Sequence, residues 1–149
     1  MRILIILIFI SFTSFGQTYD DIMSIDGLDT FKKVVIENSF QLDTENTDDD
    51  KVSYNNIEDT KGAMHNTSGY PIFIFYFSKT SIIGNLEMTD TPYDEIYKEV
   101  KKKCEFVRIQ TMKSSDYACY ECEDAKFNGL IGFTMFEGLG IVQQIIMEE

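Results

Sequence analysis

The sequence predicts an α+β fold in which two helices pack on a largely antiparallel sheet that ends in a four-stranded meander. An amphipathic segment at 92–103 carries capping signals at both ends. An apolar run at 71–78 has the length of a strand, and four strand-like segments separated by turn signals follow residue 103. A parallel sheet would need a helix between most strands, so the order helix, strands, helix, strands favours an antiparallel sheet.

The N-terminus has the pattern of a secretory signal peptide. An arginine at position 2 precedes an apolar run at 3–10, and a more polar stretch follows. Small residues at Ser14 and Gly16 predict cleavage before Gln17, whose side chain could then cyclise. The alternative is an uncleaved anchor, but crossing a bilayer takes about 20 apolar residues, more than this run offers.

These observations predict the compartment and the domain organisation. Residues 1–16 form the signal peptide, and residues 17–149 form a single α+β domain, exported to a periplasmic or extracellular space. No later segment is long and apolar enough to span a membrane, so we expect no stable membrane insertion after cleavage.

Two helices are predicted. In the segment 92–103, Thr91 is the expected N-cap, Pro92 fits the first helical position, and three lysines close the last turn. An earlier helix is predicted at about 27–38, where apolar residues share one face and Asp26 or Ser24 offers a cap.

Strands are predicted in the regions between and after the helices. The run 71–78 reads as a central strand buried on both faces, with 81–88 as its hairpin partner and Gly84 marking a bulge. Weaker strand patterns lie at 40–42, 52–54 and 64–67.

The meander is predicted to comprise four strands, at 104–111, 116–122, 130–136 and 141–147. Turn signals lie at 113–115, 128–129 and 138–140. Each half of the chain would then hold a helix followed by strands, so a duplication of a helix-plus-sheet unit is a hypothesis, although no residue-level repeat supports it.

The three cysteines predict a structural disulfide. Residues three apart on a strand point to opposite faces, so Cys119 and Cys122 could not bond with each other. A hairpin register that places Phe106 opposite Tyr120 also places Cys104 opposite Cys122, and Cys119 opposite Val107. We therefore predict a Cys104–Cys122 disulfide, with Cys119 as a buried apolar residue. A zinc site formed by the cysteines and His65 is a weaker alternative.

The composition argues against nucleic-acid binding. The chain has 13 basic and 25 acidic residues, a net charge of −12, and such a surface repels phosphate backbones. The acidity is densest at 43–50, but this segment lacks the Gly and Glu positions of a calcium-binding EF-hand loop, which predicts a solvated acidic loop.

No catalytic motif is recognisable in the sequence. His65 is the only histidine, and phosphate-binding glycine loops, nucleophile elbows and metal-binding histidine pairs are missing from the sequence. We therefore expect no enzymatic activity and no cofactor.

Two functional classes fit this sequence. The first is an exported binding or inhibitory module for an unknown protein, with tyrosines as candidate interface anchors, chiefly Tyr93, Tyr97, Tyr117 and Tyr120 and more weakly Tyr54 and Tyr70. The second is a carrier of an apolar small molecule in a cavity between sheet and helix. Its candidate lining consists of phenylalanines: Phe73, Phe75, Phe77, Phe106, Phe133 and Phe136. A filled core with an exposed aromatic patch would favour the binding module.

Overall fold

A computed structural model describes residues 17–56, 61–68, 72–78, 81–83, 86–88 and 91–146. The predicted signal peptide and its membrane-anchor alternative lie outside these residues. Within the described ranges, no helix combines the length and the apolar character needed to cross a membrane.

The fold is α+β, as predicted, with three helices and one large antiparallel sheet in the described part of the chain. The helices are α1 (Tyr19–Met23), α2 (Leu28–Glu37) and α3 (Pro92–Lys103). The first six strands are β1 (Gln41–Leu42), β2 (Lys51–Asn56), β3 (Lys61–Asn66), β4 (Phe73–Ser78), β5 (Ser81–Ile83) and β6 (Leu86–Met88). The last four are β7 (Glu105–Met112), β8 (Ser115–Glu121), β9 (Leu130–Phe136) and β10 (Leu139–Ile145).

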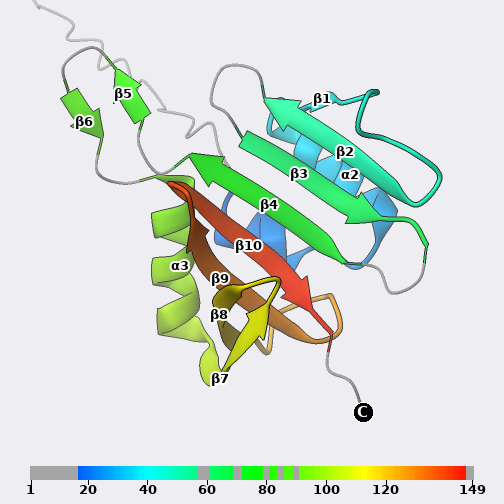
Figure 1. The fold of residues 1–149 in the computed structure, drawn as a ribbon. Coiled ribbons are helices and arrows are strands. Elements are labelled where there is room, and N and C mark those ends of the chain that lie inside the picture. The colour runs from blue at the N-terminus through cyan, green and yellow to red at the C-terminus, as the bar shows by residue number, and fades with distance from the viewer. Residues whose placement is uncertain are drawn as a thin grey trace, which may run out of the picture.

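The large sheet has eight strands in the order β1-β2-β3-β4-β10-β9-β8-β7, and every neighbouring pair is antiparallel. The predicted meander is confirmed as β7 to β10. Its last strand pairs with β4 at the centre of the sheet, where Phe75 lies opposite Val142 (Figure 1). The two edge strands are therefore β1 and β7.

Helix α3 begins and ends where the sequence predicts. Thr91 caps it, accepting a hydrogen bond from the backbone N–H of Asp94, while the Asp94 carboxylate accepts one from the Thr91 N–H. Pro92 occupies the first turn and three lysines the last turn. The buried face consists of Tyr93, Ile96 and Val100.

Helix α2 confirms the second predicted helix, although its N-cap is Gly27 and not Asp26 or Ser24. The Thr30 hydroxyl accepts hydrogen bonds from the backbone N–H groups of Asp26 and Gly27, which satisfies both donors at this end. Helix α1 was not predicted. It spans five residues, too few for an apolar period to be visible, but Thr18 and Asp21 form a capping box at its start.

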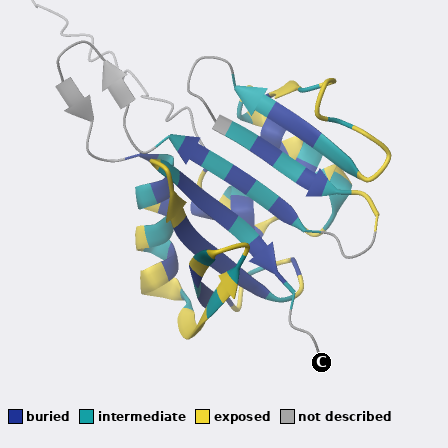
Figure 2. Ribbon diagram, viewed as in Figure 1, coloured by how far each residue is buried: buried dark blue, intermediate teal, exposed yellow. Residues whose placement is uncertain are grey.

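The main core lies between the sheet and the helices. Alternate residues of β4 point into it, and Phe73, Phe75 and Phe77 are fully buried (Figure 2). A smaller cluster, including Tyr117, Cys119 and Leu130, is buried on the opposite face of the C-terminal half of the sheet.

Two strand predictions are wrong. The segments 81–83 and 86–88 pair with each other in a separate two-stranded sheet, whereas β4 pairs with β3 and β10. The C-terminal strand takes the place beside β4 that sequence proximity suggested for 81–88. Gly84 lies outside the described residues. Strand β4 is central, but it is fully buried on one face only, because Ile74 and Tyr76 keep partial exposure on the other.

The last predicted turn is also shorter than expected. It consists of Glu137 and Gly138, both with positive φ, and β10 already starts at Leu139. Gly140 therefore lies in the strand. A Cβ at this position would stand 2.5 Å from the Tyr93 ring, so the glycine permits the close approach of α3 to β10.

Candidate binding surface

The most exposed apolar part of the described sheet is its edge strand β7. Phe106 is 52% exposed, Val107 41% and Ile109 57%. The opposite edge strand, β1, has only two residues, whereas β7 has eight. An edge strand presents backbone N–H and C=O groups on its unpaired side, so β7 can accept another extended segment. We refer to residues 105–112 as the β7 edge.

The register of β7 against β8 explains how these side chains are displayed. Phe106 lies opposite Tyr120 as predicted, but a β-bulge follows at Val107, and Arg108 therefore faces Cys119. The predicted pair of Cys119 with Val107 is wrong for this reason. Beyond the bulge the pairing is regular through Met112.

Aromatic rings connect the β7 edge to helix α3. The Phe106 ring lies 5.6 Å from the Tyr120 ring, which lies 6.0 Å from the Tyr97 ring. The hydroxyl groups of Tyr97 and Tyr120 are 3.2 Å apart, and the Lys101 Nζ lies 4.6 Å from the centre of the Tyr97 ring. Burial raises the pKa of Tyr120 to about 12, so this hydroxyl stays protonated and keeps its hydrogen. These aromatic contacts pack the β7 edge against helix α3.

The residues that lead into the β7 edge are basic in an otherwise acidic protein, whereas the β7 edge itself holds one base, Arg108, and one acid, Glu105. Residues 98–113 hold six basic and two acidic residues, in a chain whose net charge is −12. Three of the bases, Lys101, Lys102 and Lys103, end α3 directly before β7. Arg108 lies within the strand and lines an open groove with Ile109, Gln110 and Ile146; its guanidinium donates to the Gln110 Oε1 at 2.8 Å.

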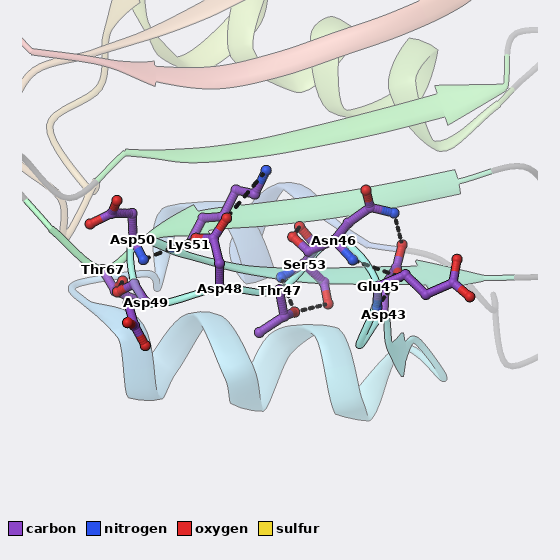
Figure 3. A network of polar contacts seen from close by, with 10 residues as sticks. All are labelled: Asp43, Glu45, Asn46, Thr47, Asp48, Asp49, Asp50, Lys51, Ser53 and Thr67. Carbon is purple, nitrogen blue, oxygen red and sulfur yellow. Dashed lines mark hydrogen bonds and ion pairs between the residues drawn. The ribbon is translucent and has the colours of Figure 1, made fainter.

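The acidic segment 43–50 lies at the other end of the sheet, between β1 and β2. Its carboxylates organise their own loop: Asp43 accepts hydrogen bonds from the side chain of Asn46, and Asp48 accepts from the backbone N–H groups of Asp50 and Lys51 (Figure 3). Hydrogen bonds from Asn46 lower the pKa of Asp43. The Thr47 hydroxyl accepts from the Ser53 N–H, so this loop also occupies part of the β2 backbone.

The predicted disulfide is present: Cys104, the C-cap of α3, is bonded to Cys122 just after β8. The zinc alternative fails, because cysteines in a disulfide cannot act as thiolate ligands. Cys119 is free and fully buried, and burial raises the pKa of its thiol. In the parts of the chain that the structure describes, no cluster of three or more His, Cys, Asp or Glu side chains could hold a metal ion.

The four candidate interface tyrosines occupy different environments. Tyr93, Tyr117 and Tyr120 are buried, and Tyr97 is half-buried. Tyr97 and Tyr120 belong to the aromatic contacts behind the β7 edge, whereas Tyr117 lies on the opposite face of the sheet. Their contact with a partner stays a prediction. Of the weaker candidates, Tyr54 is buried, and Tyr70 lies outside the described residues.

The phenylalanines that could line a carrier cavity fall into two groups. Phe73, Phe75, Phe77 and Phe133 are buried and make ring contacts with each other or with tyrosines, including a 4.7 Å stack of Phe133 on Tyr97. Phe106 and Phe136 are exposed. The aromatic residues at the centre of the sheet thus fill the layer beneath the helices with one another.

Sequence reasoning did not single out Ile109 or the basic stretch 98–113 as a surface. The predicted interface anchors were tyrosines, and three of the four main candidates, Tyr93, Tyr117 and Tyr120, are buried. A usable signal was present, because a run of lysines that directly precedes a predicted strand suggests a charged edge.

No protein-family model, curated protein or solved structure matches this chain.

Proposed function

We propose that this protein is an exported, non-catalytic binding or inhibitory module, and that its partner is a protein with an acidic, extended segment that adds as a strand to the β7 edge. The observation that carries this proposal is the combination of exposed apolar side chains on one long edge strand with a local excess of positive charge in the stretch 98–113, including three lysines in the last turn of α3 directly before that strand. Strand addition takes its affinity from backbone hydrogen bonds and its specificity from alternate side chains.

The apolar contribution comes from Phe106, Val107 and Ile109. Each is a large side chain with two fifths or more of its surface exposed, and burying such surface releases about 25 cal/mol per Å². Phe106 is held against Tyr120, so little side-chain entropy is lost when a partner covers it.

The charge contribution selects the partner. A carboxylate-bearing segment gains attraction from the basic stretch 98–113, whereas the rest of this acidic protein repels it. The resulting field both orients an acidic segment towards β7 and discourages docking elsewhere. A second copy of this chain is a less suitable partner, because its acidic segment 43–50 is already engaged in loop hydrogen bonds.

Export is part of this proposal. The signal-peptide pattern supports it, and a disulfide is typical of proteins that reach an oxidising compartment. We further propose that the two halves arose by duplication, since α2 followed by β1 to β4, and α3 followed by β7 to β10, are two helix-plus-meander units whose last strands pair. The carrier function has no comparable observation in its favour.

The binding mode can be tested with two synthetic peptides that share an alternating Val-Thr centre and differ in their flanks, which carry glutamates in one and lysines in the other. We expect the acidic peptide to bind and to slow amide hydrogen exchange selectively at the β7 edge. Arg108→Glu and Ile109→Thr should each weaken this binding about tenfold, equivalent to about 1.4 kcal/mol. Fluorescence anisotropy with the labelled peptides measures both effects.

Leu42→Thr is the matched control, because Leu42 is 51% exposed on the opposite edge strand β1 and should not affect binding. The proposal is wrong if neither peptide binds, if the lysine peptide binds equally well, or if protection appears away from β7. Self-association through β7, seen by sedimentation and abolished by Ile109→Thr, would assign this edge to a second copy instead.

A further inference from the structure

Gln17 is the most deeply buried polar side chain in the described part of the protein. It is 2% exposed, and neither its Oε1 nor its Nε2 has a hydrogen-bond partner. The contrast with Gln144 is informative: that side chain is also buried, but its Nε2 donates to the Asn128 carbonyl at 2.6 Å. A buried primary amide without a hydrogen-bond partner destabilises the fold, so its presence at Gln17 requires an explanation.

The residues that follow Gln17 hold it against the protein. The Thr18 N–H donates to the Asp21 carboxylate at 2.9 Å, which fixes the start of α1. Tyr19 is buried, its hydroxyl donates to Asp124 at 2.6 Å, and the Lys103 Nζ lies 4.1 Å from the centre of its ring. Gln17 is therefore not on a free tail, because the next two residues are anchored by side-chain contacts.

We propose that Gln17 is a modification site, where the exported chain carries an N-terminal pyroglutamyl lactam. This inference rests on the proposed export, which places cleavage before Gln17. Hydrolysis of the Gly16–Gln17 peptide bond by a leader peptidase frees the α-amine of Gln17. The amine nitrogen attacks the side-chain Cδ, a lactam C–N bond forms, the Cδ–Nε2 bond breaks, and Nε2 leaves as ammonia with the proton lost by the amine. No oxidant or reductant takes part.

The lactam suits this position better than glutamine does. Cyclisation removes the unpartnered Nε2 from this buried side chain, keeps the carbonyl oxygen, and makes the new N-terminus neutral. It also removes a positive charge from the N-terminal end of α1, where the helix dipole disfavours cations. The five-membered ring is neutral and more compact than the open side chain.

Intact mass and N-terminal sequencing of the exported protein test the inference. We expect a chain that begins at Gln17, lacks the mass of one ammonia, and resists sequential degradation from its N-terminus. Gln17→Asn is the control, because its shorter side chain cannot form a five-membered lactam; this variant should keep a free, sequenceable N-terminus. Burial of the ring should make removal by a pyroglutamyl aminopeptidase on the order of a hundredfold slower from the native protein than from the unfolded chain.

The outcomes separate this inference from the export proposal. A chain that begins at Gln17 with a free amine would overturn the modification and leave export intact. A chain that retains residues 1–16 would overturn both. A lactam that the aminopeptidase removes equally fast from native and unfolded protein would show that the modified residue is not buried, which contradicts the structural reason for it.

Discussion

A single buried histidine gives this protein an internal pH probe. His65 is 3% exposed, its ring lies 5.2 Å from the Phe31 ring, and its Nδ1 lies 2.6 Å from the Asn66 carbonyl. Desolvation lowers its pKa from the ordinary value of 6.5; the hydrogen bond with the Asn66 carbonyl offsets part of this effect, and the nearby Lys32 adds to it. The folded protein therefore resists protonation at this site more than the unfolded chain does.

The sign of the resulting pH dependence follows directly. The contribution of His65 to the free energy of unfolding is constant above about pH 6.5, where His65 is neutral in both the folded and the unfolded state. Stability is lost as the pH falls below this value, because the unfolded chain binds the proton more strongly. We expect the free energy of unfolding to fall between about pH 6.5 and pH 5. Urea unfolding at several pH values measures this slope.

His65→Phe is the informative variant, since His65 is the only histidine and the new ring can still pack on Phe31. The slope above pH 5 should become shallower, whatever the absolute stability of the variant. A wild-type protein that becomes more stable on acidification over this range would show that the folded pKa is raised, contrary to the burial argument.

The three cysteines have separable roles. The Cys104–Cys122 bond joins the end of α3 to the end of β8, and closing a loop of this length stabilises a protein by roughly 3 kcal/mol in the chain-entropy model. We expect Cys104→Ser with Cys122→Ser to lower the free energy of unfolding by about this amount. Denaturant unfolding of the double variant beside the oxidised wild type measures the loss.

Cys119→Ala is the control for this experiment, because it removes the free thiol and leaves the bond in place. Its cost should be well below that of the double variant. Peptide mapping without reductant should give a fragment that links Cys104 to Cys122, and Cys119 should react with thiol reagents only after unfolding. A Cys119–Cys122 fragment would refute this assignment.

At the scale of the elements, the contact between α3 and β10 depends on Gly140. A Cβ there would lie 2.5 Å from two ring atoms of Tyr93, a buried residue that cannot move into solvent without cost. We expect Gly140→Ala to destabilise the protein by about 1–3 kcal/mol through overpacking. Thermal or denaturant unfolding provides the measurement.

Gly62→Ala provides a matched substitution in another strand. Its Cβ would have no neighbour closer than 3.6 Å, which is ordinary van der Waals contact, so we expect little loss of stability. Equal losses for the two variants would mean that strand propensity, and not the helix contact, determines the cost at Gly140.

Local signals account for the elements that sequence analysis predicted well. Helix α3 has a cap, a proline in its first turn and an apolar stripe, all within twelve residues. The turn before β8 is less regular: Lys113 and Ser114 both adopt positive φ without being glycine, and the prediction there relied on the serines. Helix α1 escaped prediction because five residues are too few to show a period.

The long-range pairing could not be read from local patterns. Nothing in the sequence of β4 shows that its neighbour is β10, because an apolar strand accepts many partners, and residues 81–88 were the nearest candidate. The same limit applies to the candidate site. Phe106 and Ile109 are exposed because β7 is an edge strand. The position of β7 in the sheet depends on the order of all eight strands and cannot be read from its own residues.

At the scale of the whole molecule, charge and sheet order act together. The acidic segment 43–50 lies beside one edge strand and the basic stretch 98–113 leads into the other, so the two ends of one sheet carry opposite local charge. This polarity is invisible in the net charge of −12. The basic stretch 98–113 is therefore the part of the protein least like its average composition.

The central pairing of β4 with β10 also determines when the fold can be completed. Synthesis delivers a chain from its N-terminus, yet the middle of this sheet needs Val142, from the last strand of the sheet, opposite Phe75. Until then β4 has an open side, and its phenylalanine-rich sequence is the kind that aggregates. The eight-stranded sheet therefore cannot close before β10 has been synthesised.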